Sequence, residues 1–167
     1  LAAMARATPQ ELARQAGIGD SRAARLCAAF ALGRRAVWRD GRRPGSVSSA
    51  SEVYARVWPR LAGLDQEVCL VLALGTANQV ILEVEVTRGG LGSVEIHPRE
   101  VFRAALRVAA AAVVVVHNHP SGSLDPSAED LAITGRLRSS GDLLGLPLLD
   151  HVIVAASGYR SIAEYLG

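Results

Sequence analysis

A run of four valines, Val113–Val116, leads directly into two histidines and places the strongest constraint on the fold of this chain. Valine favours β-strands, because its branched side chain packs well on a pleated surface. Alternate residues of a strand point to one face, so His117 and His119 project two imidazoles from one side of its end. Asp130 follows eleven residues later, near the start of an expected helix. Two imidazoles and a carboxylate, with a fourth position open, match the ligand set of a catalytic zinc site.

The apolar pattern of the remaining sequence predicts an α/β fold. Strands are expected where apolar residues run together or alternate, and helices where a capping residue precedes an apolar face. We expect strands over 67–74, 80–86, 94–96, 112–118 and 148–154 and helices over 98–111, 127–139 and 162–166, with Gly141 stopping the second helix. This order predicts a mixed β-sheet flanked by helices.

The sequence divides into three expected parts, namely 1–37, 38–60 and 61–167. Residues 1–37 are expected to form two short helices, and the second of these helices should end near Gly33. Residues 38–60 are expected to form a linker with a short helix. The helices are joined by a turn that contains Gly17 and Gly19. This arrangement resembles a helix-hairpin-helix motif, in which backbone amides of the turn meet a phosphate at a helix start. The alternative is a glycine hairpin that joins two packed helices.

The charge distribution along the chain is uneven. Residues 1–43 carry nine arginines against three acidic residues, whereas residues 44–167 carry nine against thirteen, and the chain contains no lysine. A basic head on an acidic body indicates that nucleic acid could contact the head. The alternative is a surface helix that is merely rich in arginine.

Composition restricts the location and the kind of metal site. Cys27 and Cys69 lie in apolar surroundings, which predicts buried free thiols of a reducing cytoplasm. No Cys-x-x-Cys motif exists, which excludes a zinc site of paired thiolates. The longest apolar run, 108–116, has nine residues, far short of the roughly 20 that a membrane span needs. No secretion signal is visible, so we expect a cytoplasmic protein without membrane contact.

The spacing around the two histidines resembles a known motif. The pattern His117-x-His119-x7-Ser127-x2-Asp130 is similar to the JAMM motif of JAB/MPN-domain metalloproteins. The segments 97–102, 117–122, 127–130 and 148–153 resemble the RadC family of that superfamily, and the resemblance covers nearly all of 8–167. It implies a JAB/MPN-like (cytidine-deaminase-like) mixed sheet flanked by helices behind the small helical head.

The resemblance also implies a site and a reaction. His117, His119 and Asp130 would hold one zinc ion per chain, with a water molecule as its fourth ligand. This water would attack an amide carbonyl, as in a metallopeptidase or isopeptidase-like hydrolase. A glutamate on the first strand would be the base, which by position is Glu67. Ser127 would donate a hydrogen bond to the developing oxyanion.

Several assignments stay open at this point. Glu83, Glu85 and Glu95 are rivals for the role of the base, and Ser127 could simply cap the following helix.

The other polar residues near the motif are assigned structural roles. His97 is expected to begin a helix and His151 a buried strand, and Asn118 is expected to point to the opposite face and serve a turn. The expected partner is a peptide or protein substrate of unknown identity. The alternative function is that of a DNA-repair or recombination accessory protein, which binds DNA through Gly17 and Gly19.

Overall fold

The structure is a computed structural model that describes residues 4, 7–15, 17–39, 45–89 and 96–166. It divides into two units, Leu1–Arg42 and Arg43–Gly167. A search of the described residues finds no helix that is long and apolar enough to span a membrane.

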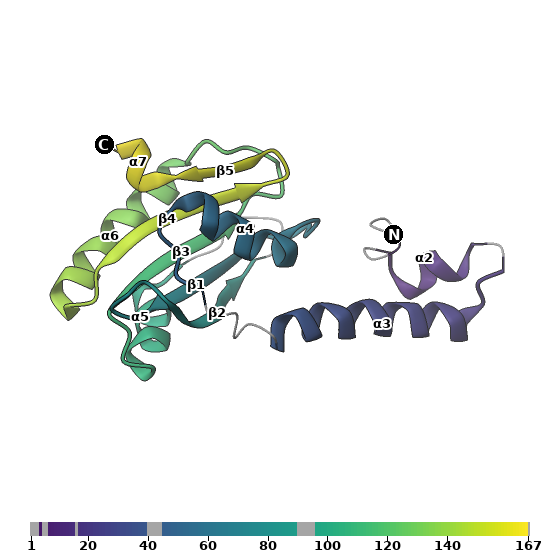
Figure 1. Cartoon of the computed structure of the whole chain (residues 1–167). Helices are drawn as coiled ribbons and strands as arrows, with labels where there is room; N and C mark the ends of the chain where they lie inside the picture. Colours follow the sequence, from purple (N-terminus) through teal and green to yellow (C-terminus); the bar gives the residue numbers. More distant parts are fainter. Residues whose placement is uncertain (1–3, 5–6, 16, 40–44, 90–95, 167) are drawn as a thin grey trace. The chain divides into compact units, whose positions relative to one another are not determined.

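The second unit is built on a five-stranded mixed sheet in the order β2-β1-β3-β4-β5 (Figure 1). The strands β3 and β4 are parallel, and the other neighbouring pairs are antiparallel. All residues of β1 and β3 are buried, as in a sheet that is covered on both faces. The strands are β1 (Val68–Leu74), β2 (Val80–Arg88), β3 (Ala112–Asn118), β4 (Leu148–Ala155) and β5 (Gly158–Ser161).

Helices cover both faces of this sheet. α4 (Ala50–Leu61) packs on one face, in a core that includes Val114 and Val116 of β3. α5 (Pro98–Arg107) and α6 (Ala128–Leu144) pack on the other, in a core that includes Val113 and Val115. The alternation along β3 therefore puts His117 on the face of α5 and α6 and Asn118 on the face of α4. The short helix α7 (Ile162–Leu166) ends the unit.

The mixed sheet flanked by helices confirms the predicted fold class. The strands expected over 67–74, 80–86, 112–118 and 148–154 match β1, β2, β3 and β4 to within two residues. The strand expected over 94–96 falls mainly on residues outside the described part of the chain. β5 was not predicted, because its short and largely exposed sequence lacks an apolar run.

Two predicted helix ends of the second unit are wrong. α5 stops at Arg107 rather than near residue 111, because Ala109 adopts a left-handed backbone conformation with φ of 49°. α6 continues through Gly141 to Leu144, and Gly145 caps its end with a φ of 65° that suits glycine. A Cβ atom on residue 141 would lie 2.6 Å from the carbonyl oxygen of Leu146, so this glycine permits close packing instead of ending the helix.

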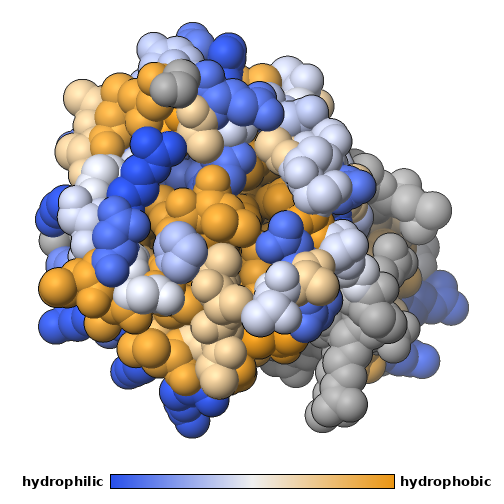
Figure 2. Space-filling view, turned by 60° about the vertical axis from the view of Figure 1, so that its left-hand side comes forward, coloured by the Kyte–Doolittle hydropathy of each residue, from blue (hydrophilic) through white to orange (hydrophobic). Residues whose placement is uncertain are grey.

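The surface of the molecule is mixed in character. Figure 2 shows apolar side chains exposed between charged and polar ones on the face that it presents. Leu106 and Leu143 are among the exposed large hydrophobic residues. Exposed apolar residues of this kind are normal on protein surfaces and indicate no function by themselves.

The first unit contains the two expected helices, α2 (Pro9–Ala13) and α3 (Asp20–Arg39). Thr8 and Glu11 form a capping box at the start of α2. The expected helix end at Gly33 is wrong, because α3 continues to Arg39. The short helix expected within 38–60 is α4, which belongs to the second unit.

Candidate metal centre

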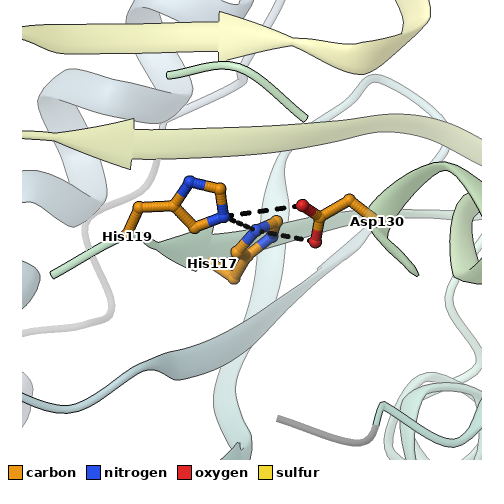
Figure 3. A group of neighbouring side chains, drawn as sticks. All are labelled: His117, His119 and Asp130. Atoms are coloured by element: carbon orange, nitrogen blue, oxygen red, sulfur yellow. Dashed lines mark hydrogen bonds and ion pairs between the residues drawn. The ribbon is translucent and has the colours of Figure 1, made fainter. Parts of the chain in front are cut away.

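Three side chains converge where β3 ends and α6 begins (Figure 3). His117 is the penultimate residue of β3, His119 follows the strand, and Asp130 lies in the first turn of α6. The Nε2 atom of His117 lies 2.9 Å from Nε2 of His119 and 3.1 Å from Oδ1 of Asp130. Nε2 of His119 lies 3.5 Å from Oδ2 of Asp130. The structure thus brings together all three residues that the sequence predicted as metal ligands.

These distances fit a tetrahedral metal ion. Bonds of about 2.0–2.1 Å to nitrogen and oxygen imply about 3.3 Å between neighbouring ligand atoms of a tetrahedral zinc site. The three separations, 2.9, 3.1 and 3.5 Å, lie around that value. His117 is fully buried and Asp130 is 7% exposed, so an ion here would be largely shielded from solvent. The cluster is therefore a candidate metal site with three protein ligands.

A capping box positions the carboxylate of Asp130. The backbone amide of Asp130 donates to Oγ of Ser127 at 3.0 Å, which caps α6. The backbone amide and the hydroxyl of Ser127 both donate to Oδ2 of Asp130, at 2.7 and 2.6 Å. Helix capping and ligand placement thus use the same two residues, and the predicted cap at Ser127 is confirmed.

The site is electrostatically prepared for a cation. Burial opposes ionisation of Asp130, but its contacts with His117, His119 and Ser127 hold the pKa of that carboxyl far below its usual range. The hydrogen bond to Asp130 raises the pKa of His119, while partial burial acts in the opposite direction. Asp130 is therefore a carboxylate at neutral pH and supplies negative charge next to both imidazoles.

The loop after β3 orients the second histidine. Nδ1 of His119 lies 3.0 Å from the carbonyl oxygen of Ser123, which can only accept a hydrogen bond. Nδ1 therefore carries a proton, and Nε2 faces the cluster. A backbone carbonyl in this position is a common partner of histidines that bind metals.

Two further polar residues, Thr134 and His151, lie behind the cluster and were not predicted to belong to it. Nε2 of His151 lies 2.8 Å from Nδ1 of His117, and Nδ1 of His151 lies 2.6 Å from the hydroxyl of Thr134. Thr134 is four residues after Asp130, so the helical period alone could have placed it near the site. His151 comes from a neighbouring parallel strand, which the local sequence does not reveal.

Asn118 points away from the cluster, as expected, but the expected turn role is wrong. Its Oδ1 accepts from the backbone amide of Val68 at 2.8 Å, and its Nδ2 donates to the carbonyl oxygen of Gln66 at 3.0 Å. The side chain thus extends the pairing of β3 with the start of β1. The two bonded residues flank Glu67, so Asn118 fixes the backbone on both sides of the candidate base.

Glu67 lies directly before β1 and is half-buried. The contact with Asp130 mainly raises the pKa of His119 and burial mainly raises the pKa of Cys69, and the charge of Glu67 adds to both shifts. Two other candidates for the base form ion pairs with α4: Glu83 contacts Arg56, and Glu85 contacts Arg60. These contacts place both rivals at the opposite face of the sheet.

The remaining residues named in the sequence analysis are less informative. Glu95 lies outside the described part of the chain. His97 precedes α5 as its N-cap residue. Cys69 is a buried free thiol, as predicted, whereas Cys27 is free but only partly buried. In the first unit, Gly17 has a φ of 83° and its carbonyl oxygen accepts a bond from Arg22.

Comparison with known proteins identifies the family. A UPF0758 protein of Rubrobacter xylanophilus is 44% identical over 160 residues, which cover 95% of this chain and 70% of that protein. A UPF0758 protein of Syntrophotalea carbinolica is 44% identical over 162 residues, or 96% of this chain and 71% of that protein. Residues 47–166 match the RadC-like JAB domain. This match confirms the resemblance read from the motifs: the chain belongs to the family of proteins with a RadC-like JAB domain.

Proposed function

We propose that this protein is a zinc-dependent hydrolase of amide bonds, of the metallopeptidase or isopeptidase type. The observation that carries the proposal is the convergence of His117, His119 and Asp130, whose ligand atoms all lie within 4.8 Å of one another. Membership of the JAB family supports a hydrolase. Two imidazoles and one carboxylate leave a fourth position open, as in catalytic rather than structural zinc sites.

Each protein residue has a definable task in this reaction. The two imidazoles and the carboxylate would hold one zinc ion per chain. A zinc ion lowers the pKa of a water molecule to about 7 and polarises a carbonyl group. Glu67 would take a proton from the attacking water and give it to the departing amine. Its coupling to His119, together with the backbone clamp from Asn118, supports this role over Glu83 and Glu85.

Ser127 would donate a hydrogen bond to the negative charge that develops on the substrate oxygen. In the structure its hydroxyl donates to Asp130 and accepts from the backbone amide of the same residue. Its single proton is therefore engaged in the capping box. A role in stabilising the oxyanion would require the hydroxyl to rotate during the reaction.

A peptide-library cleavage screen tests the proposal. Wild-type protein loaded with zinc should cleave a subset of peptide or isopeptide substrates, and a chelator should abolish the cleavage. His119→Ala should cleave none of them, because a ligand is missing. Equal cleavage by both proteins would mean that a contaminant or another site is responsible, and no cleavage by either would count against a peptide substrate.

A second candidate function is DNA binding by the first unit, in a DNA-repair or recombination protein. The arrangement of two helices around Gly17 and Gly19, which resembles a helix-hairpin-helix motif, favours it together with the excess of arginine in residues 1–43. Fluorescence anisotropy with duplex DNA over a salt series tests it. Phosphate contacts predict an affinity that falls as salt rises, whereas no affinity at low salt would contradict DNA binding.

A further inference from the structure

A chain of hydrogen bonds connects two of the three proposed ligands behind the site. It begins at the backbone carbonyl of Asp130, which lies 2.6 Å from the hydroxyl of Thr134. The same hydroxyl lies 2.6 Å from Nδ1 of His151, whose Nε2 lies 2.8 Å from Nδ1 of His117. Thr134, His151 and His117 are all essentially fully buried, so no solvent can exchange for these partners.

The carbonyl group at the start determines the direction of the whole chain. A backbone carbonyl only accepts, so the single hydroxyl proton of Thr134 is donated to Asp130. The hydroxyl oxygen is then left as an acceptor, and Nδ1 of His151 must carry the proton that it receives. His151 is fully buried, and its two ring nitrogens lie next to a hydroxyl and an imidazole rather than a carboxylate, which favours the neutral ring. In a neutral ring with a proton on Nδ1, Nε2 is an acceptor.

The same reasoning extends to the ligand. If Nε2 of His151 accepts, Nδ1 of His117 must donate the proton that lies between them. A neutral His117 with its proton on Nδ1 has a lone pair on Nε2. That nitrogen is the atom that faces His119 and Asp130.

We propose that Thr134 and His151 are positioning residues that place the proton of His117 on Nδ1 and direct its Nε2 lone pair to the metal. This inference rests on the proposed zinc site and adds two residues that lie behind the proposed ligands. Thr134 follows Asp130 on α6, so the helix that supplies the carboxylate also sets the proton position of a histidine on β3. Partners of this kind orient a histidine ligand and raise its basicity.

Zinc affinity, measured by competition with a chelating indicator, tests the proposal. Thr134→Val keeps the shape of the side chain but removes the acceptor, and it should weaken zinc binding about 10- to 100-fold. Thr134→Ser retains the hydroxyl and should stay within about threefold of wild type. His151→Phe, which leaves Nδ1 of His117 without an acceptor, should also weaken binding at least about tenfold. Wild-type affinity in folded Thr134→Val and His151→Phe would overturn the proposal.

A direct view of the protons separates this role from a purely structural one. Long-range 1H–15N NMR of the zinc-free protein near neutral pH should find the His151 proton on Nδ1 and the bridging proton on Nδ1 of His117. A His151 proton on Nε2 would overturn the proposal, even if Thr134→Val failed to fold. Because this spectrum needs neither zinc nor a substrate, its result stands apart from that of the proposed function. Failure of the wild type to bind zinc would instead overturn the proposed hydrolase.

Discussion

The two units of the chain differ in how far their side chains are buried. In the second unit, His117, Asn118, Thr134 and His151 are buried, and each one has hydrogen-bond partners on another element. In the first unit, Leu12 and Ala23 are the buried hydrophobic residues among those whose burial is described, and most other side chains there are exposed.

The difference shows where structure constrains function most strongly. A buried polar group without a partner is costly, so a cluster of such groups adopts few arrangements. None of the buried side-chain nitrogen and oxygen atoms in the described residues lacks a partner. The site in the second unit can therefore be argued atom by atom. The exposed turn around Gly17 is held by its backbone geometry and by one exposed hydrogen bond from Arg22, which constrain function less strongly.

The largest expected effect follows from removing a ligand in the second unit. His119→Ala should carry no zinc when purified without chelators, whereas the wild type should carry about one ion per chain. Elemental analysis measures both. His97→Ala is the matched control, because it removes a histidine outside the cluster and should keep the metal. Equal zinc in wild type and His119→Ala would place the metal elsewhere.

Removal of the proposed base should separate metal binding from chemistry. Glu67→Gln keeps the size of the side chain but cannot take a proton, so the rate of hydrolysis should fall about 10²- to 10⁴-fold while zinc remains. Glu11→Gln alters a glutamate of the first unit and should leave the rate unchanged. An unchanged rate in Glu67→Gln would transfer the role to another carboxylate.

The clamp next to the base should contribute to stability. Asn118→Leu leaves the amide of Val68 and the carbonyl of Gln66 without their partner, which should cost about 1–3 kcal/mol of unfolding free energy. Urea denaturation measures this loss. Asn78→Gly is the control, because Asn78 lies in an exposed turn with a φ of 56°, where glycine is well tolerated. Equal effects of the two changes would contradict a clamp at Asn118.

The smallest expected effect compares the capping boxes of the two units. Ser127→Ala should cost about 1 kcal/mol of unfolding free energy and also weaken zinc binding, because the same box holds Asp130. Thr8→Ala removes the corresponding cap of α2 and should leave zinc affinity unchanged. Denaturation and chelator competition measure the two effects. Zinc affinity that is equal in both variants would show that the box at Ser127 serves α6 alone.

The sequence predicted that His117, His119 and Asp130 would converge, because local rules place these residues. Strand alternation puts His117 and His119 on one face, and the capping box puts Asp130 at the start of α6. His151 and Asn118 were assigned other roles, because their partners lie on neighbouring strands and depend on register. Two predicted helix ends of the second unit were also wrong. Ala109 ends α5 without a glycine, and Gly141 serves tight packing rather than a helix end.

The proposed reaction depends on one zinc ion bound by His117, His119 and Asp130. Anomalous diffraction from crystals of zinc-loaded protein, recorded on both sides of the zinc absorption edge, tests it most directly. The account predicts one strong peak per chain within bonding distance of Nε2 of both histidines and an oxygen of Asp130. A map without a peak there, or with its zinc at other residues, would contradict the account.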